Sequence, residues 1–529
     1  ESLEREVSSL PGKDMAGNGS RLFMPVIRLM GWMLGKVWRR LFTRVEVDEK
    51  NLAEAKEAFA KQPAIILPSH KSHVDYLMIS YVCFAYGIPM PVICAGDNLN
   101  IFFLGRILRL AGCFFIKRNF SASDQSTYRT ACRIYIRDLL KPPADGGANL
   151  PLEFFMEGGR SRHGKLMRAK LGMLRMVVEA MKHGGDRDCT FVPVALTYDV
   201  VPEGKDYAQQ LLGKQKMPES TTMVLSMAYE LYTTRKSFNC GCAYVRFAKS
   251  LSMTCLLEKC NENLEEIAIE VQRAIALAGV IPATALVATA LLSLRLQGNR
   301  LSIEKVSRCT KQIESFVLLA GGEVPSTPWN ITLILEQLGC CVYADGYMKF
   351  DAGDPIVVLQ LSFLRNQLLH FFTGAFQGIE RQILSNEYQY GLEDFPVEEV
   401  AVADLPFFRQ LLRSFSLPYL EAYWVAALTE LDQSGCYERA SLIKEARQEV
   451  RSRIRCGELN CAEALSKDTL ANGLAWCQGY GSANAANLPH ILYNAVVQAR
   501  GSRPGIVHNI SRRKRNKRDY LPIGHAFVL

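Results

Sequence analysis

Short apolar runs and longer amphipathic segments alternate along the chain between about residue 60 and residue 250. The β-rich apolar runs, which predict strands, lie at 64–67, 91–94, 114–116, 152–156, 190–197 and 243–247. The segments with helix-like spacing of apolar residues lie at 75–86, 127–140, 167–181 and 222–233. Such alternation is typical of an α/β domain. We therefore predict an α/β fold with a mainly parallel sheet flanked by helices.

The pattern becomes mostly helical after about residue 260. Helical segments at 357–372 and 405–431 follow an apparent hairpin, whose strands 341–343 and 347–350 are joined at Asp345-Gly346. We divide the chain into an amphipathic N-terminal segment (1–50), the α/β domain (51–260), a largely helical region (261–480) and a basic, poorly ordered tail (481–529). The tail contains the cluster Arg512–Arg518, which either binds acidic lipid or nucleic acid or is simply solvated.

Two segments have enough apolar character to meet a membrane. Leu22–Phe42 carries four basic residues, too many for a membrane span but suited to a helix lying among lipid headgroups. Packing of its apolar face on the protein is an equal alternative. Ala274–Leu294 has no charge over 21 residues, but Gly279 and Pro282 interrupt it. We predict a buried helix that begins near Pro282, and a protein that associates with the membrane surface without crossing it.

The composition is that of an ordinary globular protein. Of 529 residues, 49% are hydrophobic and 22% charged, which excludes a disordered chain, a collagen-like repeat and a small disulfide scaffold. The net charge of +9 favours anionic partners, namely phosphates, acidic lipid headgroups or nucleic acid. The 16 cysteines are scattered without a C-x-x-C pair, so we expect no metal site and a reducing compartment.

The first residues with catalytic potential, His70 and Asp75, form an H-x4-D pattern directly after the apolar run 64–67. In a continuous helix, positions five apart point about 140° away from each other. The two side chains can meet if His70 lies in the strand-to-helix turn and Ser72 caps a helix that begins near His73. Asp75 would then accept from one imidazole nitrogen and leave the other free to remove a proton from a hydroxyl group. His73 is the alternative base.

Two further predicted strands end in basic residues. The strand that begins near Gly112 ends in Lys117 and Arg118. The strand at 152–156 runs into a turn with an acid, two glycines and two arginines, namely Glu157, Gly158, Gly159, Arg160 and Arg162. Guanidinium groups beside permissive glycine backbone can hold a phosphate through charge-assisted hydrogen bonds. Solvated loop ends are the alternative.

Two other classes of protein are compatible with parts of this pattern. Gly159–Lys165 satisfies the G-x4-G-K part of a nucleotide-binding P-loop, but Leu166 stands where Ser or Thr must bind magnesium, which argues against a nucleotide hydrolase. A non-catalytic protein that binds lipid or nucleic acid through its positive charge is the second alternative. This second alternative does not explain why the motifs follow one another in this order.

Four blocks in this order resemble those of the glycerolipid acyltransferase superfamily, namely residues 70–75, 112–118, 155–162 and 192–198. Within it the chain is similar to the glycerol-3-phosphate and dihydroxyacetone-phosphate acyltransferase branch. Stretches at 86–93, 108–112, 211–213 and 218–222 tilt the resemblance towards the peroxisomal dihydroxyacetone-phosphate enzymes, whereas 157–160 also resembles bacterial glycerol-3-phosphate enzymes. Two features depart from the pattern: Lys117 replaces an arginine, and the chain ends Phe527-Val528-Leu529 instead of with a Ser-Lys-Leu-like signal.

The resemblance implies acyl transfer from acyl-CoA to the 1-hydroxyl of dihydroxyacetone phosphate, the first step of ether-lipid and glycerophospholipid synthesis. Glycerol 3-phosphate is the alternative acceptor. His70, oriented by Asp75, would be the general base of a direct ternary mechanism without a cofactor, acyl-CoA being a co-substrate. The implied location is the peroxisomal membrane surface, with the mitochondrial outer membrane or the endoplasmic reticulum as alternatives and without nucleic acid as a partner.

The resemblance also implies which residues surround the acceptor phosphate. This predicted site comprises Lys117, Arg118, Glu157, Gly158, Arg160 and Arg162. We expect the cations to bind the phosphate and Glu157 to brace the turn without reacting itself. The lysine at position 117 cannot form the bidentate contact that an arginine would make.

Overall fold

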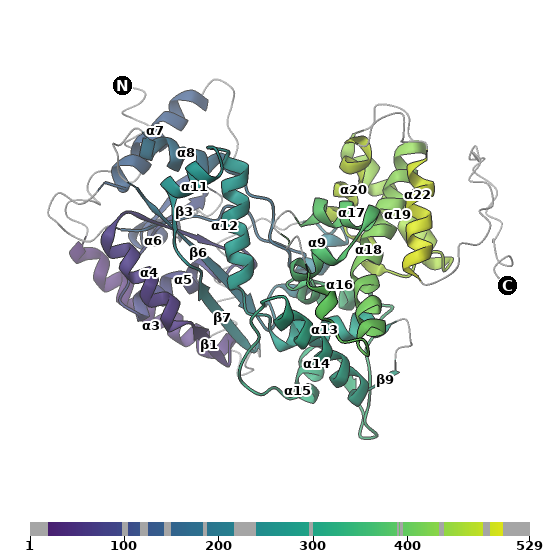
Figure 1. The fold of residues 1–529 in the computed structure, drawn as a ribbon. Helices are drawn as coiled ribbons and strands as arrows, with labels where there is room; N and C mark the ends of the chain where they lie inside the picture. Colours follow the sequence, from purple (N-terminus) through teal and green to yellow (C-terminus); the bar gives the residue numbers. More distant parts are fainter. Residues whose placement is uncertain are drawn as a thin grey trace, which may run out of the picture.

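The computed structural model describes residues 20–97, 104–116, 125–141, 150–182, 188–215, 240–295, 300–388, 391, 395–432, 438–479 and 487–500. Two lobes lie side by side in it (Figure 1). One contains a twisted sheet between two layers of helices, and the other is built mainly of helices from the second half of the chain. The predicted α/β fold with a largely helical C-terminal region is confirmed.

The sheet has eight strands, of which most run parallel. They are β1 (Arg44–Val47), β2 (Ala64–Pro68), β3 (Val92–Gly96), β4 (Cys113–Ile116), β5 (Leu152–Glu153), β6 (Thr190–Tyr198), β7 (Cys242–Phe247) and β8 (Leu251–Ser252). Their order is β1-β7-β6-β2-β5-β3-β4, with β8 beside β6. Two pairs in this sheet are antiparallel, β6 with β7 and β6 with β8. The predicted strands are confirmed, while the short, partly charged β1 had no apolar run to reveal it.

Helices cover both faces of the sheet. On one face lie α3 (Ser20–Leu41), α4 (Glu49–Lys61) and α5 (Asp75–Ala85), and on the other α7 (Gln125–Leu139), α8 (Leu171–Lys182), α11 (Met253–Lys259) and α12 (Leu264–Ala278). In the central strand β2, Ile66 packs into the first layer, while Ile65 and Leu67 pack into the second. Because both faces of this strand are buried, its sequence is continuously apolar.

Three of the four helices predicted in the α/β domain are confirmed as α5, α7 and α8. The segment predicted at 222–233 lies outside the described residues. The N-terminal helix α3 packs along α5 through its inner face, and β1, which follows it, pairs with β7. The sheet therefore begins at residue 44, inside the segment that we separated as 1–50.

The helical lobe is organised around α13 (Ala283–Leu294), whose twelve residues are all buried. Its other elements are β9 (Arg300–Ser302), α14 (Ile303–Leu319), α15 (Ile331–Gln337), β10 (Cys341–Val342), β11 (Tyr347–Lys349), α16 (Pro355–Arg365), η3 (Leu369–Ala375), α17 (Gly378–Glu387), η4 (Val397–Glu399), α18 (Leu405–Asp432), α19 (Arg439–Arg455), η5 (Ala462–Leu465), α20 (Lys467–Gly479) and α22 (Leu488–Ala499). The predicted hairpin is confirmed as β10 and β11.

The apolar stretch Ala274–Leu294 is divided between two helices, as its glycine and proline predict. α12 ends at Ala278, and Pro282 caps α13, which is the predicted buried helix. Within the described ranges, no helix is both long and apolar enough to cross a membrane.

The helical region extends beyond the boundary that we placed at residue 480. α22 has an apolar face that includes Leu492 and Val496, and it packs against α18 through these buried residues. The tail after residue 500, with its basic cluster, lies outside the described residues.

Candidate active site

Ligand sites of parallel sheets form at the carboxyl ends of the strands, and three polar side chains of this protein lie at such ends. His70 follows the end of β2, Glu157 follows β5, and Tyr198 is the last residue of β6. Since β2 pairs in parallel with both β5 and β6, these ends meet at one edge of the sheet. The candidate active site is built on this edge.

His70 and Asp75 meet in the turn between β2 and α5. Nδ1 of His70 lies 2.8 Å from Oδ2 of Asp75, and the Asp75 side chain is fully buried. The same carboxylate accepts hydrogen bonds from the backbone N–H groups of Lys71 at 2.6 Å and Ser72 at 2.8 Å, and from the Tyr198 hydroxyl at 2.6 Å. Because a carboxylate only accepts, it fixes the imidazole tautomer that carries its proton on Nδ1 and leaves Nε2 unprotonated.

The surroundings of the imidazole hold it in one orientation. The ring of Phe155 lies 4.2 Å from that of His70, measured between centroids, and the His70 side chain is 15% exposed. Nε2 forms no hydrogen bond with any described residue, so it is available to a substrate hydroxyl. In this geometry the pair can act as a general base with its orienting acid.

The helix after this turn starts later than its sequence suggests. α5 begins at Asp75, not near His73, because the Asp75 carboxylate itself accepts the free backbone N–H groups of the turn. The Ser72 hydroxyl accepts only a long contact from the backbone N–H of Val74, 3.3 Å, and donates to Glu203 at 2.8 Å. The predicted cap at Ser72 is therefore wrong in detail.

Glu157 joins two backbone segments of the site. One of its oxygens accepts from the backbone N–H of His70 at 2.7 Å, and the other from that of Met167 at 2.8 Å. Burial raises the pKa of Glu157 to about 8, against the lowering effect of these two hydrogen bonds and of Lys71. Glu157 thus connects the His70 turn to the backbone at Met167.

Lys71 reaches from the same turn into the helical lobe. Its Nζ donates to Gln367 Oε1 at 3.1 Å, and its side chain is buried. Burial lowers the pKa of Lys71 to about 8, although Glu157 and Asp75 raise it. Lys71 thus connects the turn after β2 to a residue of the C-terminal half of the chain.

The turn after β5 presents its two arginines next to the His70 turn. Gly158 has φ +61°, a conformation that favours glycine, and a Cβ there would collide with Lys170. Nη1 of Arg160 lies 2.6 Å from Nδ1 of His73 and 3.3 Å from the Tyr207 hydroxyl. Nε of Arg162 donates to Gln210 Oε1 at 2.6 Å. These contacts hold both guanidinium groups next to the His70 turn, where they add positive charge that can attract an anion.

His73 occupies a different position from His70. Its Nδ1 lies 2.7 Å from Glu203 Oε1, and Glu203 also accepts from the His73 backbone N–H at 2.8 Å. Burial raises the pKa of Glu203, but the hydrogen bonds from His73 outweigh burial and keep it below its ordinary value. Because Nδ1 of His73 already faces both Glu203 and Arg160, His73 is the weaker candidate for the base.

The described structure does not reach every predicted site residue. Lys117 and Arg118 lie outside it, although β4 before them ends at the same edge of the sheet. Lys165, the lysine of the apparent P-loop, is 4% exposed and forms an ion pair with Glu387, so it does not face a nucleotide. Among the described residues, no group of three or more His, Cys, Asp or Glu side chains is arranged to hold a metal ion.

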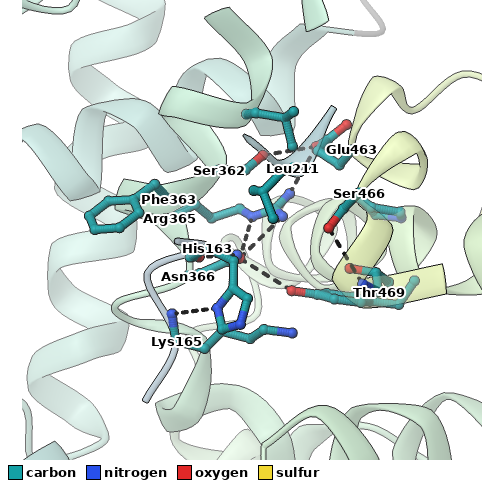
Figure 2. A pocket seen from close by; sticks show the side chains of 13 residues that line it. His163, Lys165, Leu211, Ser362, Phe363, Arg365, Asn366, Glu463, Ser466 and Thr469 are labelled. Atoms are coloured by element: carbon teal, nitrogen blue, oxygen red, sulfur yellow. Dashed lines mark hydrogen bonds and ion pairs between the residues drawn. The ribbon is translucent and has the colours of Figure 1, made fainter. Parts of the chain in front are cut away.

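A polar hollow lies where the two lobes meet, and Figure 2 shows its side chains. It holds about 360 Å³ of empty space, part of it open to solvent, between residues such as His163 and Lys165 of one lobe and Asn366 of the other. Glu463 accepts from Arg295 at 2.8 Å and from Arg365 at 3.3 Å. Since these charges are paired within the protein, we interpret the hollow as part of the interface between the lobes and not as a binding site for a charged ligand.

Three residues of the site were not selected from the sequence. Tyr198 ends the fourth block, and its place at a strand end beside β2 was a usable signal. Glu203 follows in the turn before α9 (Gly204–Leu211), where no motif marks it. Lys71 lies inside the first block, but nothing in the sequence indicates its contact with a residue almost 300 positions away.

Comparisons with known proteins match most of the chain to one family of enzymes. Residues 44–197 match the acyltransferase family, and residues 207–375 and 380–483 match the glycerol-3-phosphate acyltransferase C-terminal region. The chain is 26% identical to the mouse dihydroxyacetone phosphate acyltransferase, over 86% of this chain and 77% of that protein. It is 29% identical to a glycerol-3-phosphate acyltransferase of Histophilus somni, over 80% of this chain and 52% of that protein.

A third relative has a higher identity over a shorter length. The chain is 35% identical to a probable mitochondrial glycerol-3-phosphate acyltransferase of Caenorhabditis elegans, over 44% of this chain and 32% of that protein. The chain thus spans about half the length of the bacterial relative and about a third of the nematode one. The two matching regions together cover both lobes, and the chain belongs to the family of glycerol-3-phosphate and dihydroxyacetone phosphate acyltransferases.

Proposed function

We propose that the protein transfers an acyl group from acyl-CoA to the 1-hydroxyl of dihydroxyacetone phosphate, with glycerol 3-phosphate as the alternative acceptor. The observation that carries the proposal is the buried Asp75 carboxylate, which lies 2.8 Å from Nδ1 of His70 and accepts hydrogen bonds from the surrounding turn and from Tyr198. The experiment is a comparison of kcat/KM for the two acceptors with palmitoyl-CoA as donor. A higher value for dihydroxyacetone phosphate supports the first assignment, and the reverse order supports the alternative.

In the proposed reaction, Nε2 of His70 removes the proton of the acceptor hydroxyl as its oxygen attacks the thioester carbonyl. The new ester bond forms as the carbon–sulfur bond breaks, and CoA leaves as the thiol after taking up the proton from His70. Asp75 stabilises the imidazolium that exists between these events. A positioned general base of this kind contributes roughly 10²–10⁴ to the rate.

The acceptor phosphate is the natural ligand for the arginines of the turn after β5. Charge-assisted hydrogen bonds from Arg160 and Arg162 would hold it and align the hydroxyl with the thioester. Lys117 and Arg118 remain predicted members of this phosphate site. Glu157 and Gly158 give the turn its shape.

Replacing Arg160 by methionine is expected to raise KM for the acceptor by roughly 10- to 100-fold, the effect of losing a hydrogen bond to a charged group. Steady-state kinetics with each substrate varied in turn measures the effect, and KM for palmitoyl-CoA should change less than threefold. Arg175→Met, on the exposed side of α8, is the matched control. An equal rise for both substrates would contradict the assignment of Arg160 to the acceptor.

An apolar hollow between α3 and α5 offers space for the acyl chain of the donor. It comprises about 460 Å³ of empty space, part of it open to solvent, and its walls include Met30 and Leu34 of α3 and Tyr76 and Leu77, which follow Asp75. Burial of apolar surface stabilises binding by about 25 cal/mol per Å². The hollow thus provides a place for the chain close to the residues that act on the thioester.

Filling this hollow by Ser80→Phe is expected to raise KM for palmitoyl-CoA by about tenfold or more, since excluded methylene groups each lose about 0.8 kcal/mol. Short donors such as butyryl-CoA should be affected less than twofold. Ser315→Phe, on the exposed face of α14, is the control. Equal effects on long and short donors would show that the hollow does not hold the chain.

We also propose that α3 docks on an anionic membrane surface. Its inner face is packed on the protein, whereas Leu29, Trp32 and Met33 are more than half exposed on its outer face. The ammonium group of Lys36 lies 3.7 Å from the centre of a Trp32 ring, and the helix contains no acidic residue. Aromatic and apolar residues with flanking cations are typical of helices in the interfacial plane.

The triple variant Leu29→Ser, Trp32→Ser, Met33→Ser is expected to bind anionic phosphatidylserine vesicles at least about tenfold more weakly, because its apolar contact area is removed. Vesicle co-sedimentation measures the change. A triple serine variant of three exposed apolar residues elsewhere, Leu318, Leu333 and Val402, should bind like the wild type. Unchanged binding of the α3 variant would refute this docking surface.

A further inference from the structure

We propose that the helical lobe positions the arginine-bearing turn against His70, and that Lys165 and Glu387 form the buried contact through which it does so. The inference rests on the proposed function, because it assigns the acceptor site to that turn. It concerns the loop at 157–170, which contains Arg160 and Arg162. Lys165 is in this view a positioning residue, and the helical lobe is needed for acceptor binding.

The inner side of the loop is attached to the catalytic turn. The backbone N–H of Ser161, next to Arg160, donates to the carbonyl oxygen of His70 at 2.8 Å. Glu157 accepts from the backbone of His70 and, at the far end of the loop, from that of Met167. The position of the guanidinium groups relative to the imidazole therefore depends on how this loop is held.

The outer side of the loop is attached to the helical lobe through the ion pair between Lys165 and Glu387. The two side chains are 4% and 0% exposed. The second oxygen of Glu387 accepts from the Tyr423 hydroxyl at 2.8 Å and from Asn472 at 3.1 Å, which fixes the carboxylate on α18 and α20. Because the carboxylate of this buried pair is also hydrogen-bonded through its other oxygen, the pair has one well-defined geometry. Such a pair is suited to hold a loop in place.

Two neighbouring contacts bring the backbones of the lobes together, as Figure 2 shows for His163 and Asn366. Asn366 Nδ2 donates to the His163 carbonyl oxygen at 2.8 Å. Gly164 has φ +82° and lies so close to the carbonyl group of Phe363 that a Cβ would overlap with it. The loop is thus fixed from both sides, with the arginines between the two sets of contacts.

The chemical consequence follows from the sensitivity of catalysis to distance. A displacement of about 1 Å can cost on the order of 10²-fold in rate when it moves a reacting group out of alignment. Loosening the outer contact would let the arginines, and the phosphate they hold, move relative to Nε2 of His70. The acyl donor, which we place in the hollow beside α3, would bind as before.

The test uses the full chain with Lys165→Met, Glu387→Gln and the double variant. Each is expected to raise KM for the acceptor at least about tenfold and to change KM for palmitoyl-CoA less than twofold. The double variant should be no worse than Lys165→Met, because removing both partners leaves no unpaired buried charge. Arg500→Met with Glu421→Gln, an ion pair of the helical lobe away from the loop, is the control and should leave both KM values unchanged.

A second variant and a second readout keep the inference testable if Lys165→Met does not fold. Gly164→Ala should produce the same rise in acceptor KM, and hydrogen exchange at 157–170 should accelerate in every variant except the control. Folded variants with unchanged acceptor KM and unchanged exchange would overturn the inference. If the wild type transfers no acyl group, the proposed function fails, while hydrogen exchange still decides whether this contact holds the loop.

Discussion

Replacing His70 by alanine is expected to lower kcat for acyl transfer by roughly 10²–10⁴-fold, the contribution of a positioned general base. The acceptor hydroxyl would have to lose its proton to water, while both substrates still bind. KM for either substrate should therefore change little. Asp75→Asn should also lower kcat strongly, since an amide can donate to Nδ1 and would favour the wrong imidazole tautomer.

The matched comparison for this prediction is His73→Ala. Nδ1 of His73 is already engaged by Glu203 and Arg160, so its loss should act mainly on KM for the acceptor. Single-turnover measurement of ester formation separates chemistry from product release. If His70→Ala retained more than about a tenth of the wild-type rate and His73→Ala lost it, the base would have been assigned to the wrong histidine.

Replacing Glu153 by methionine is expected to stabilise the protein by about 1–3 kcal/mol near pH 8, the cost of a buried polar group without a partner. Glu153 lies on β5, fully buried between helices and sheet, and neither of its carboxyl oxygens has a hydrogen-bond partner among the described residues. Burial raises the pKa of Glu153 well above its ordinary value, and the nearby Asp75 raises it further.

This pKa shift predicts the pH dependence of stability. Between the ordinary carboxyl pKa and the raised one, the folded protein binds more protons than the unfolded chain. The contribution of Glu153 to the free energy of unfolding is therefore largest at acidic pH. It falls as pH rises, by up to about 1.4 kcal/mol per pH unit. Glu153→Met should remove this decline from urea unfolding curves measured between pH 5 and pH 8.

Glu179→Met, the same substitution at an exposed position on α8, controls for the change in side chain and should alter stability by less than about 0.5 kcal/mol. A decline with pH that persists unchanged in Glu153→Met would contradict the assignment of this titration to Glu153. Activity measured in parallel reports whether a carboxyl group behind Asp75 also matters to the reaction.

The sequence predicted those parts of the fold that depend on short-range patterns. The apolar run of β2 and the H-x4-D spacing were sufficient to place His70 in a strand-to-helix turn within reach of Asp75, because no continuous helix allows that contact. Pro282 likewise marked the start of α13. Each of these features is decided by residues within a few positions of one another.

Features that depend on distant parts of the chain were not predicted. Glu387 becomes a partner of Lys165 only when α17 packs beside the loop after β5, and in the sequence Lys165 resembled a phosphate-binding lysine. α22 owes its order to contact with α18, since its neighbourhood is rich in small and polar residues. The start of α5 was misplaced because Asp75 serves two functions, as partner of His70 and as acceptor for the backbone N–H groups of Lys71 and Ser72 in the turn before the helix.

The most direct test of the account is incubation of the full chain with radiolabelled palmitoyl-CoA and either dihydroxyacetone phosphate or glycerol 3-phosphate. We expect a palmitoyl ester of the acceptor and one equivalent of free CoA thiol, with both products suppressed in His70→Ala. Protein that is folded, as judged by circular dichroism, and that forms no ester with either acceptor would contradict it.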